Sequence, residues 1–504
     1  MLKKRSAFQR MGSSTTVFKM SVMPIDDQKN KDVPDRDIGK HIEDGSFCVC
    51  IIGAGAAGLC AASRCVAAGF SVTVFEQGSG IGGTWIYEDI PVDKNVHSSM
   101  YKNLIANLPK EIMAYDDFTP LPNTNFASDS NEPSPSFISQ DEMLQYLKEF
   151  GKVTLHFNSR VVNVERNEYD TSNEKANWKV TVANSTSVDT KWKIDDQHGS
   201  LLYTCHNFDV VFVCNGHYSV PRTPEFATKY RKPAIHSHYY RDARDYSGQT
   251  ICVVGAGPSG SDIALQVAEY ADKVYLSHKP IPAEGNTFGS LPKNCVPVSA
   301  VTDADNDMLK LVNGQTLSDL DNVIYCTGYK YSIPFLGSKI IRTPEDGAMV
   351  SPLFAHCVHV DYYDSLFFIG INWLALPFRI FDHHVHLALA FMSHALPSEK
   401  VTLEMVKGYE ENRIRDLQTN SMALKNFHRL WTEQWDYFEW IREVTISNKS
   451  NFPHLLQLKP IPLVIRMVFE DVIREMFKSL PDYKKIAYVI VDDNEFIAKK
   501  PDFN

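Results

Sequence analysis

Apolar residues occur along this chain in two alternating arrangements, as short continuous runs and as longer amphipathic stretches. Residues 47–76 contain an apolar run, a stretch with helical spacing, and a second apolar run that ends at Glu76. Residues 250–279 repeat that order. A buried strand, a helix and another buried strand account for each repeat. The alternation predicts doubly wound parallel sheets in an α/β protein.

A glycine-rich turn lies between the first strand and the helix of each repeat. It reads GAGAAG at residues 53–58 and GAGPSG at residues 255–260. The first glycine of such a turn permits the sharp bend, the second lets a pyrophosphate approach the helix N-terminus, and the third lets helix and strand pack closely. We therefore predict two dinucleotide sites. The expected contacts are Gly53, Ala54, Gly55, Ala56, Ala57 and Gly58 in one site and Gly255, Gly257, Ser259, Gly260, Ser261 and Asp262 in the other.

The two repeats differ where the second strand ends. Glu76 follows Gly53 by 76 − 53 = 23 residues, whereas the same offset in the second repeat reaches His278, with Lys279 next. A carboxylate at this place accepts hydrogen bonds from ribose hydroxyls but repels a ribose 2′-phosphate. FAD or NAD is therefore expected at the first turn. NADPH is expected at the second, where Ser277, His278 and Lys279 would receive the phosphate; a solvated Lys279 without a ligand is the alternative.

A protein with a flavin site and a nicotinamide site is an oxidoreductase, and its class depends on where the electrons go next. A disulfide reductase needs a redox-active cysteine pair just after the first repeat. Residues 78–89 (GSGIGGTWIYED) contain Trp85 and no cysteine. Cys60 and Cys65 are five residues apart in the predicted helix, so they do not face each other. We expect them to be core residues, and we expect the electrons to pass to oxygen.

The chain resembles the class B flavin monooxygenases, and most of all the flavin-containing monooxygenases. The resemblance covers roughly residues 46–400. Besides the two glycine turns it rests on EQGSGIGGTW (76–85), NLIANLPKEIMAYDDF (103–118), VCNGHYSVPRTP (213–224), YRKPAIHSHYY (230–240) and YCTGYKYSIPFL (325–336). The segment 230–240 matches the family fingerprint at His236, Ser237 and Tyr240, although Tyr230 and Lys232 replace its Phe and Gly.

The resemblance implies two Rossmann-like domains. The larger FAD domain would comprise residues 46–218 and 325–445, and a smaller NADPH domain, residues 219–324, would be inserted between them. A disordered tail (1–45) is expected to precede these domains, and a helical extension (446–504) to follow them. The first 25 residues hold five basic residues and no acidic one. A transit-type leader is therefore the alternative to a plain tail.

The resemblance also implies a reaction. NADPH reduces FAD, O2 then forms a C4a-hydroperoxyflavin, and a soft amine or sulfide takes the distal oxygen to give an N-oxide or S-oxide. Thr84 and Trp85 are expected to contact the flavin. Asn107 matches the asparagine that lies over the flavin, and it is our candidate catalytic residue because an amide donates and accepts without titrating. A turn residue before Pro109 is its alternative role.

Two other functions stay open. A Baeyer–Villiger monooxygenase acting on ketones has the same fold, but those enzymes carry Trp where this chain has Tyr240, which favours heteroatom oxygenation. A nucleotide-binding protein without catalysis would have a damaged glycine turn or lack Asn107. For His236, a structural and a functional role are equally expected.

One departure from the family concerns a histidine-rich segment. His384 and His386 stand where relatives often carry Gln and Arg, so substrate scope or oxygen handling is expected to differ. We expect no metal at His383, His384 and His386, because no H-E-x-x-H motif or cysteine pair accompanies them.

Charge and hydropathy narrow the range of partners. A net charge of −10 argues against nucleic-acid binding. The longest charge-free run, residues 45–63, contains the first glycine turn, so we expect no transmembrane anchor. The amphipathic stretch 463–477 has a polar face of mixed charge, which favours docking on the protein over an interfacial membrane helix. A cytoplasmic enzyme is expected, with peripheral association with the endoplasmic reticulum and homo-oligomers as open alternatives.

Overall fold

The computed structural model describes residues 47–89, 97–118, 135–151, 153–167, 177–184, 202–279, 291–480 and 482–500. The expected disordered tail, residues 1–45, lies outside this part of the chain, and so does its alternative as a leader. All residues predicted to bind cofactors lie within it.

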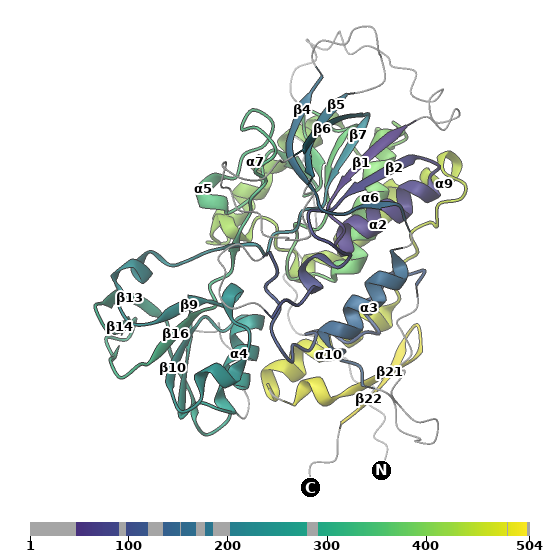
Figure 1. Cartoon of the computed structure of the whole chain (residues 1–504). Helices are drawn as coiled ribbons and strands as arrows, with labels where there is room; N and C mark the ends of the chain where they lie inside the picture. The colour runs from purple at the N-terminus through teal and green to yellow at the C-terminus, as the bar shows by residue number, and fades with distance from the viewer. Residues whose placement is uncertain are drawn as a thin grey trace. The chain divides into compact units, whose positions relative to one another are not determined.

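The first repeat contributes β1 and β2 to a seven-stranded sheet with the order β18-β19-β20-β7-β1-β2-β3. Figure 1 labels β7, β1 and β2 of this sheet. Strands β20, β7, β1, β2 and β3 are parallel, and β18 and β19 add an antiparallel edge. Helix α2 (Ala56–Ala67) follows β1, and α6 (Pro377–Met392) packs against α2. The strands are β1 (Cys48–Ile52), β2 (Ser71–Phe75), β3 (Leu155–His156), β7 (Val210–Val213), β18 (Leu353–Phe354), β19 (Val358–His359) and β20 (Leu366–Phe368).

The second repeat forms a separate parallel sheet of five strands, ordered β12-β11-β10-β16-β9. Helix α4 (Pro258–Ala268) follows β10 as α2 follows β1. The strands are β9 (Ala234–His236), β10 (Thr250–Val254), β11 (Lys273–His278), β12 (Cys295–Ser299) and β16 (Asn322–Tyr325). An antiparallel group, β13 (Val301–Asp305), β14 (Met308–Leu311) and β15 (Thr316–Leu317), follows β12 along the chain. Both parallel sheets were predicted, and each has continuous apolar strands because both of its faces are covered.

Smaller elements lie around these sheets. Strands β4 (Ser159–Arg166), β5 (Trp178–Asn184) and β6 (Leu202–Phe208) form an antiparallel meander, and β8 (Val220–Pro221) pairs with β17 (Tyr329–Lys330). Helix α3 (Gln140–Phe150) begins with the predicted capping box, in which Ser139 and Glu142 bond each other's backbone amides. Cys60 and Cys65 are both free and fully buried, as expected for core residues.

The last third of the chain contains α5 (Pro344–Gly347), α7 (Leu403–Thr419), α8 (Gln434–Val444), α9 (Asn448–Asn451) and α10 (Leu463–Lys478). A hairpin, β21 (Ala487–Asp492) with β22 (Glu495–Lys499), then follows α10. This hairpin corrects the expectation of a purely helical extension at residues 446–504. Turn residues 493–494 and the strong β-formers on both sides of them explain it.

Helix α10 docks on the protein, as its pattern predicted. Val464, Val468 and Val472 are buried in the same core as the strands of the first sheet, whereas Arg466 and Glu470 form an exposed ion pair of 2.8 Å. Its apolar face is therefore unavailable to a membrane surface. Within the described residues, no helix is long and apolar enough to cross a membrane.

Candidate dinucleotide sites

The first glycine turn has the backbone that a pyrophosphate site requires. Gly53 has φ +106°, and its amide donates to Phe75 O at 2.8 Å. A Cβ on Gly58 would lie only 1.9 Å from Gly53 O, so only glycine lets α2 start this close to β1. No side chain caps α2 at Gly55, in contrast to the capping box of α3. The first amides of α2 therefore remain available for an anion.

Glu76 is held at the end of β2 by the same turn. Its side chain is 8% exposed, and its carboxylate accepts hydrogen bonds from Ala54 N and Gly78 N, both at 2.7 Å. Burial raises the pKa of Glu76, although those amide bonds oppose the shift. A carboxylate has about four acceptor positions, so two protein bonds leave room for ribose hydroxyls. This donor and acceptor set fits FAD.

Thr84 and Trp85 lie beside the first glycine turn, in the 3-10 helix Gly83–Trp85. Gly82 N donates to Ala54 O at 3.1 Å, and a Cβ on Gly83 would come within 2.8 Å of the Gly55 Cα. Two glycine backbones thus touch at this point, and the approach brings Thr84 and Trp85 to the turn.

The segment that carries Asn107 is tied to its surroundings on both sides. Ala106 N donates to Ile138 O at 2.9 Å, and Tyr115 Oη donates to Ala56 O, in the first turn of α2, at 2.6 Å. Asn107 itself is exposed, and its Oδ1 lies 3.5 Å from the Tyr483 hydroxyl. The side chain is therefore accessible to a ligand, and its catalytic role stays a prediction.

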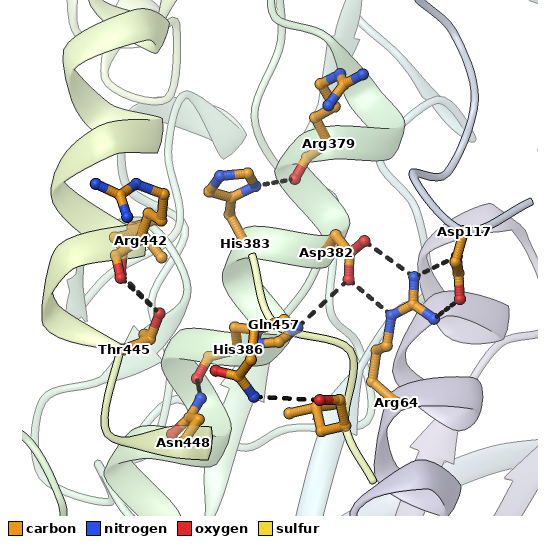
Figure 2. Close-up of polar contacts among 12 residues, drawn as sticks. Arg64, Asp117, Arg379, Asp382, His383, His386, Arg442, Thr445, Asn448 and Gln457 are labelled. Atoms are coloured by element: carbon orange, nitrogen blue, oxygen red, sulfur yellow. Dashed lines mark hydrogen bonds and ion pairs between the residues drawn. The ribbon is translucent and has the colours of Figure 1, made fainter. Parts of the chain in front are cut away.

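A buried charge network anchors the end of this segment (Figure 2). The Arg64 guanidinium on α2 bonds the Asp117 carboxylate at 2.6 and 2.7 Å and the Asp382 carboxylate on α6 at 2.7 and 3.0 Å. Burial opposes ionisation of Asp382, but the bonds and charge of Arg64 hold its pKa below the ordinary value. Arg379 adds an ion pair to Asp116 at 2.5 Å. The network joins α2, α6 and the 103–118 segment.

The histidines of α6 are core residues beside that network. His384 Nε2 lies 2.9 Å from Tyr437 Oη. His383 Nδ1 donates to Arg379 O at 2.7 Å (Figure 2). Burial lowers the pKa to about 4 for His383, about 3 for His384 and about 4 for His386, so all three are neutral near pH 7. In the part of the chain that is described, no three His, Cys, Asp or Glu side chains are placed to hold a metal ion.

The second glycine turn repeats the backbone of the first. Gly255 has φ +105° and donates to Ser277 O at 2.9 Å, and a Cβ on Gly260 would lie 1.8 Å from Gly255 O. A Cβ on Gly257, by contrast, would meet nothing within 4 Å, and Ser259 is also exposed. The space before α4 is open to a pyrophosphate, so this turn fits a dinucleotide too.

Two predicted residues of the second site are already bonded within the protein. Ser261 is buried and donates to Ala256 O at 3.3 Å. The Asp262 carboxylate accepts from Tyr101 Oη at 2.6 Å and from Lys484 Nζ at 2.7 Å. These bonds position α4, and contacts of Ser261 and Asp262 with a cofactor stay predictions.

The ribose end of the second site corrects one expectation and adds two residues. Ser277 is buried, donates to Ser299 O at 3.3 Å and accepts from Val301 N at 2.9 Å, so it does not face a phosphate. Lys279 is exposed, and His278 Nδ1 lies 2.8 Å from Lys279 O. Burial and the charges of Lys279 and Arg222 lower the pKa of Lys425, so three cations gather here. Lys425 lies 425 − 279 = 146 residues after Lys279, and Arg222 lies before the second repeat. The local sequence motif around Lys279 therefore did not predict either of them.

The fingerprint residues hold the second sheet together. His236 Nε2 lies 3.0 Å from Gly328 O, and Nδ1 accepts from His238 N at 3.1 Å. Both ring nitrogens are occupied by backbone groups, and burial lowers the pKa of His236 to about 4. Tyr240 is fully buried and bonds Gln266 Oε1 at 3.3 Å. Of the two roles left open for His236, the structure favours the structural one.

Comparisons with known proteins agree with this geometry. Residues 47–281 match the family model described as flavin-binding monooxygenase-like. The chain is 32% identical to flavin-containing monooxygenase FMO GS-OX5 of Arabidopsis thaliana over 79% of this chain and 84% of that protein. The solved structure of S-allyl-L-cysteine S-oxygenase from Allium sativum aligns with a TM-score of 0.71 and 27% identity, over 87% of this chain and 95% of that one. Tmm from Pelagibacter sp. shares the fold, with a TM-score of 0.65 at 22% identity over 88% and 93% of the two chains.

Proposed function

The chain belongs to the flavin-containing monooxygenase family, and we propose that it uses NADPH and O2 to oxygenate a small soft nucleophile, a thioether in the first place and an amine in the second. The family makes it a flavoprotein oxidoreductase whose substrates are O2 and a small molecule. The observation that carries the proposal is the pair of glycine turns with the same backbone and different ribose ends.

FAD is assigned to the first turn. The uncapped amides of α2 would hold its pyrophosphate, Glu76 its ribose, and Thr84 and Trp85 would contact its flavin end. When bound, the flavin supplies the oxygenating chemistry that the family resemblance implies, namely hydride uptake followed by transfer of one atom of O2. The protein must hold this group in a fixed pose and keep bulk water away.

NADPH is assigned to the second turn. The open face at Gly257 and Ser259 would receive its pyrophosphate, and Lys279, Lys425 and Arg222 would attract the 2′-phosphate. His278, in place of an acid, removes the repulsion that Glu76 would impose there. The domain boundaries predicted from the resemblance, with residues 219–324 as the NADPH domain, are part of this proposal.

Asn107 is proposed as the residue whose amide would donate a hydrogen bond to the flavin end of bound FAD. It is exposed in a segment held by Ala106, Tyr115 and the Arg64 network, so its backbone is fixed while its amide is free to meet a ligand. An amide keeps the same donors at any pH, which suits a group that must hold a ligand by hydrogen bonds without transferring a proton to it.

Sulfur is proposed as the preferred acceptor because of one likeness, and two further observations favour a heteroatom oxygenase over a disulfide reductase or a ketone-oxidising enzyme. The Allium sativum protein, an S-oxygenase by name, resembles this chain over most of both lengths. All ten cysteines are free, and residues 78–89 contain none. Electrons from the flavin therefore have no disulfide to reduce and pass to O2. Tyr240, buried in the second sheet, stands where ketone-oxidising relatives carry Trp.

The test is to purify the yellow protein and follow NADPH consumption, product and H2O2 with S-allyl-L-cysteine, trimethylamine and cyclohexanone. We expect the sulfoxide in near one-to-one ratio with NADPH consumed. Lactone from the ketone would establish the Baeyer–Villiger alternative. H2O2 alone with all three acceptors, or protein that binds no flavin, would refute the proposal.

A further inference from the structure

A short segment after α10 contacts both the segment that carries Asn107 and helix α4, which follows the second glycine turn. Tyr483 and Lys484 lie in the 3-10 helix Tyr483–Lys485, between α10 and β21. Tyr483 is 4% exposed and packs edge-on against Phe137, with ring centroids 5.4 Å apart. Tyr488 N in β21 donates to Ser136 Oγ at 2.7 Å. The segment thus contacts residues 136–137, which lie shortly before Ser139, the N-cap of α3.

Lys484 joins the Asn107 segment to the second site. Its ammonium donates to Ile105 O at 2.8 Å and to Asp262 Oδ1 at 2.7 Å. The side chains of Lys484 and Asp262 are only 12% and 15% exposed. One cation therefore bonds the backbone two residues before Asn107 and a carboxylate in the helix that follows the second glycine turn.

Tyr483 acts on the side chain of Asn107. A phenol hydroxyl that meets an amide oxygen donates, so Asn107 Oδ1 accepts from Tyr483 Oη across their 3.5 Å separation. Oxygen and nitrogen of an amide are set by such a partner. The Nδ2 donors of Asn107 are then directed away from the Tyr483 hydroxyl, on a side chain that is exposed.

The apolar residues around this segment are shared between two cores. Leu480, just after α10, is buried among residues of the second sheet. Val468 and Val472, within α10, are buried in the core of the first sheet. Residues near Lys484 are therefore buried in both cores. The connection between the two parts of the protein does not rest on the Lys484–Asp262 ion pair alone.

We propose that Tyr483 and Lys484 form a clamp, defined as these two residues, that positions Asn107 relative to helix α4 for oxygen transfer. The proposal rests on the function proposed above. Tyr483 orients the amide so that its donors would face the flavin when FAD is bound, and Lys484 keeps the Asn107 segment at a fixed place relative to α4, the helix of the second glycine turn. Both are positioning residues, because neither is placed to touch the reacting atoms.

The Tyr483→Phe variant tests the orienting role. It keeps the ring packed on Phe137 and removes only the hydroxyl. We expect the ratio of H2O2 formed to NADPH consumed to rise about fivefold, while the flavin content and the Kd for NADP+ stay unchanged. Tyr488→Phe is the matched control. It also removes one tyrosine hydroxyl, the one in β21 that donates to Asp471 Oδ2 at 3.0 Å. An equal rise in H2O2 formation in the two variants, or no rise in Tyr483→Phe, would contradict this role.

The Lys484→Met variant tests the joining role. Removing one partner of a nearly buried pair leaves the other charge unpaired, so we expect the Kd for NADP+ to rise about tenfold. Adding Asp262→Asn should give no further loss, and Lys484→Arg should restore most of the affinity. Lys485→Met, at the exposed neighbouring position, is the control. An additive double variant, or the same Kd change in Lys485→Met, would contradict the clamp.

Hydrogen exchange separates failure of the clamp from failure of the proposed function. In Lys484→Met, peptides covering residues 101–107 and the start of α4 should exchange faster than in Lys485→Met, whatever reaction the enzyme performs. Faster exchange without any oxygenated product would keep the clamp and refute the function. Unchanged exchange with normal oxygenation would refute the clamp alone.

Discussion

The two glycine turns have the same backbone and differ at their ends. Strand β1 pairs with β2 at Cys48↔Ser71 and β10 pairs with β11 at Thr250↔Lys273, an offset of 71 − 48 = 23 and 273 − 250 = 23 residues. A Cβ added to the third glycine would lie 1.9 Å from the carbonyl oxygen of the first glycine in one turn and 1.8 Å from it in the other. In the proposed function, the repeated part serves the pyrophosphate that FAD and NADPH share. Ligand choice must therefore come from the ribose end.

The turns also differ in what covers them. A Cβ on Gly55 would meet Gly83 at 3.4 Å, whereas one on Gly257 would meet nothing within 4 Å. A turn lined by a second segment suits a cofactor that stays bound, and an open turn suits one that exchanges in every cycle. This contrast agrees with FAD at the first turn and NADPH at the second, and four predictions test it.

The largest effect is expected from alanine at the third glycine of each turn. In Gly58→Ala the new Cβ collides with Gly53 O, so bound flavin should be lost and the free energy of unfolding should fall by about 3 kcal/mol. Gly260→Ala should collide with Gly255 O, weaken NADP+ binding and retain the flavin. Flavin absorbance and NADP+ titration measure both. Loss of flavin in both variants would mean that the two turns do not serve separate ligands.

A smaller loss is expected at the end of β2. Glu76→Gln replaces one acceptor oxygen by an NH2 group, which leaves the amide of Ala54 or Gly78 without its bond at a cost of about 2 kcal/mol. Flavin content should fall accordingly. His278→Gln, the change at the equivalent place, should leave flavin content as it is. Equal flavin content in the two purified variants would remove Glu76 from the FAD site.

The coenzyme preference should change more moderately. Lys279→Ala and Lys425→Ala each remove a cation from the proposed 2′-phosphate site, so each should raise the KM for NADPH about tenfold and leave that for NADH unchanged. Lys273→Ala, at the opposite end of β11, is the control. Equal effects on both coenzymes would show that these cations do not bind the 2′-phosphate.

The smallest effect is a pH dependence of that preference. Lys425 is a cation only below its pKa, which burial and the charges of Lys279 and Arg222 hold below the ordinary lysine value of about 10.4. The attraction is fully present below that lowered pKa and is lost as the pH rises through it. The ratio of the KM for NADPH to the KM for NADH should therefore rise about threefold as the pH rises through that lowered pKa, and Lys425→Arg should flatten the rise because arginine stays charged.

Much of the fold was predictable because local patterns determine it. Continuous apolar runs, the two glycine turns and the capping box at Ser139 each depend on a few neighbouring residues. The hairpin after α10 and the burial of Ser277 depend on which segments pack together, and a single repeat does not contain that information. The bonds of Asp262 to Tyr101 and Lys484 cross 161 and 222 residues of sequence.

The candidate sites follow the same division. Glycine positions, Glu76 and Lys279 could be read from the repeats. Lys425 and Arg222 reach the second site from distant segments, and the partners of the α6 histidines come from α8 and from α6 itself. The sequence placed these histidines in a segment expected near the flavin, and the structure shows neutral core side chains, of which His383 and His384 bond protein groups.

The most direct test of the central claim, that the two turns bind different dinucleotides, is the mass of the intact protein with its ligands after incubation with FAD, NADP+ and NAD+ together. We expect one FAD and one NADP+ on each chain, with NAD+ excluded at equal concentration. Two FAD molecules on one chain, or NAD+ bound as readily as NADP+, would contradict it.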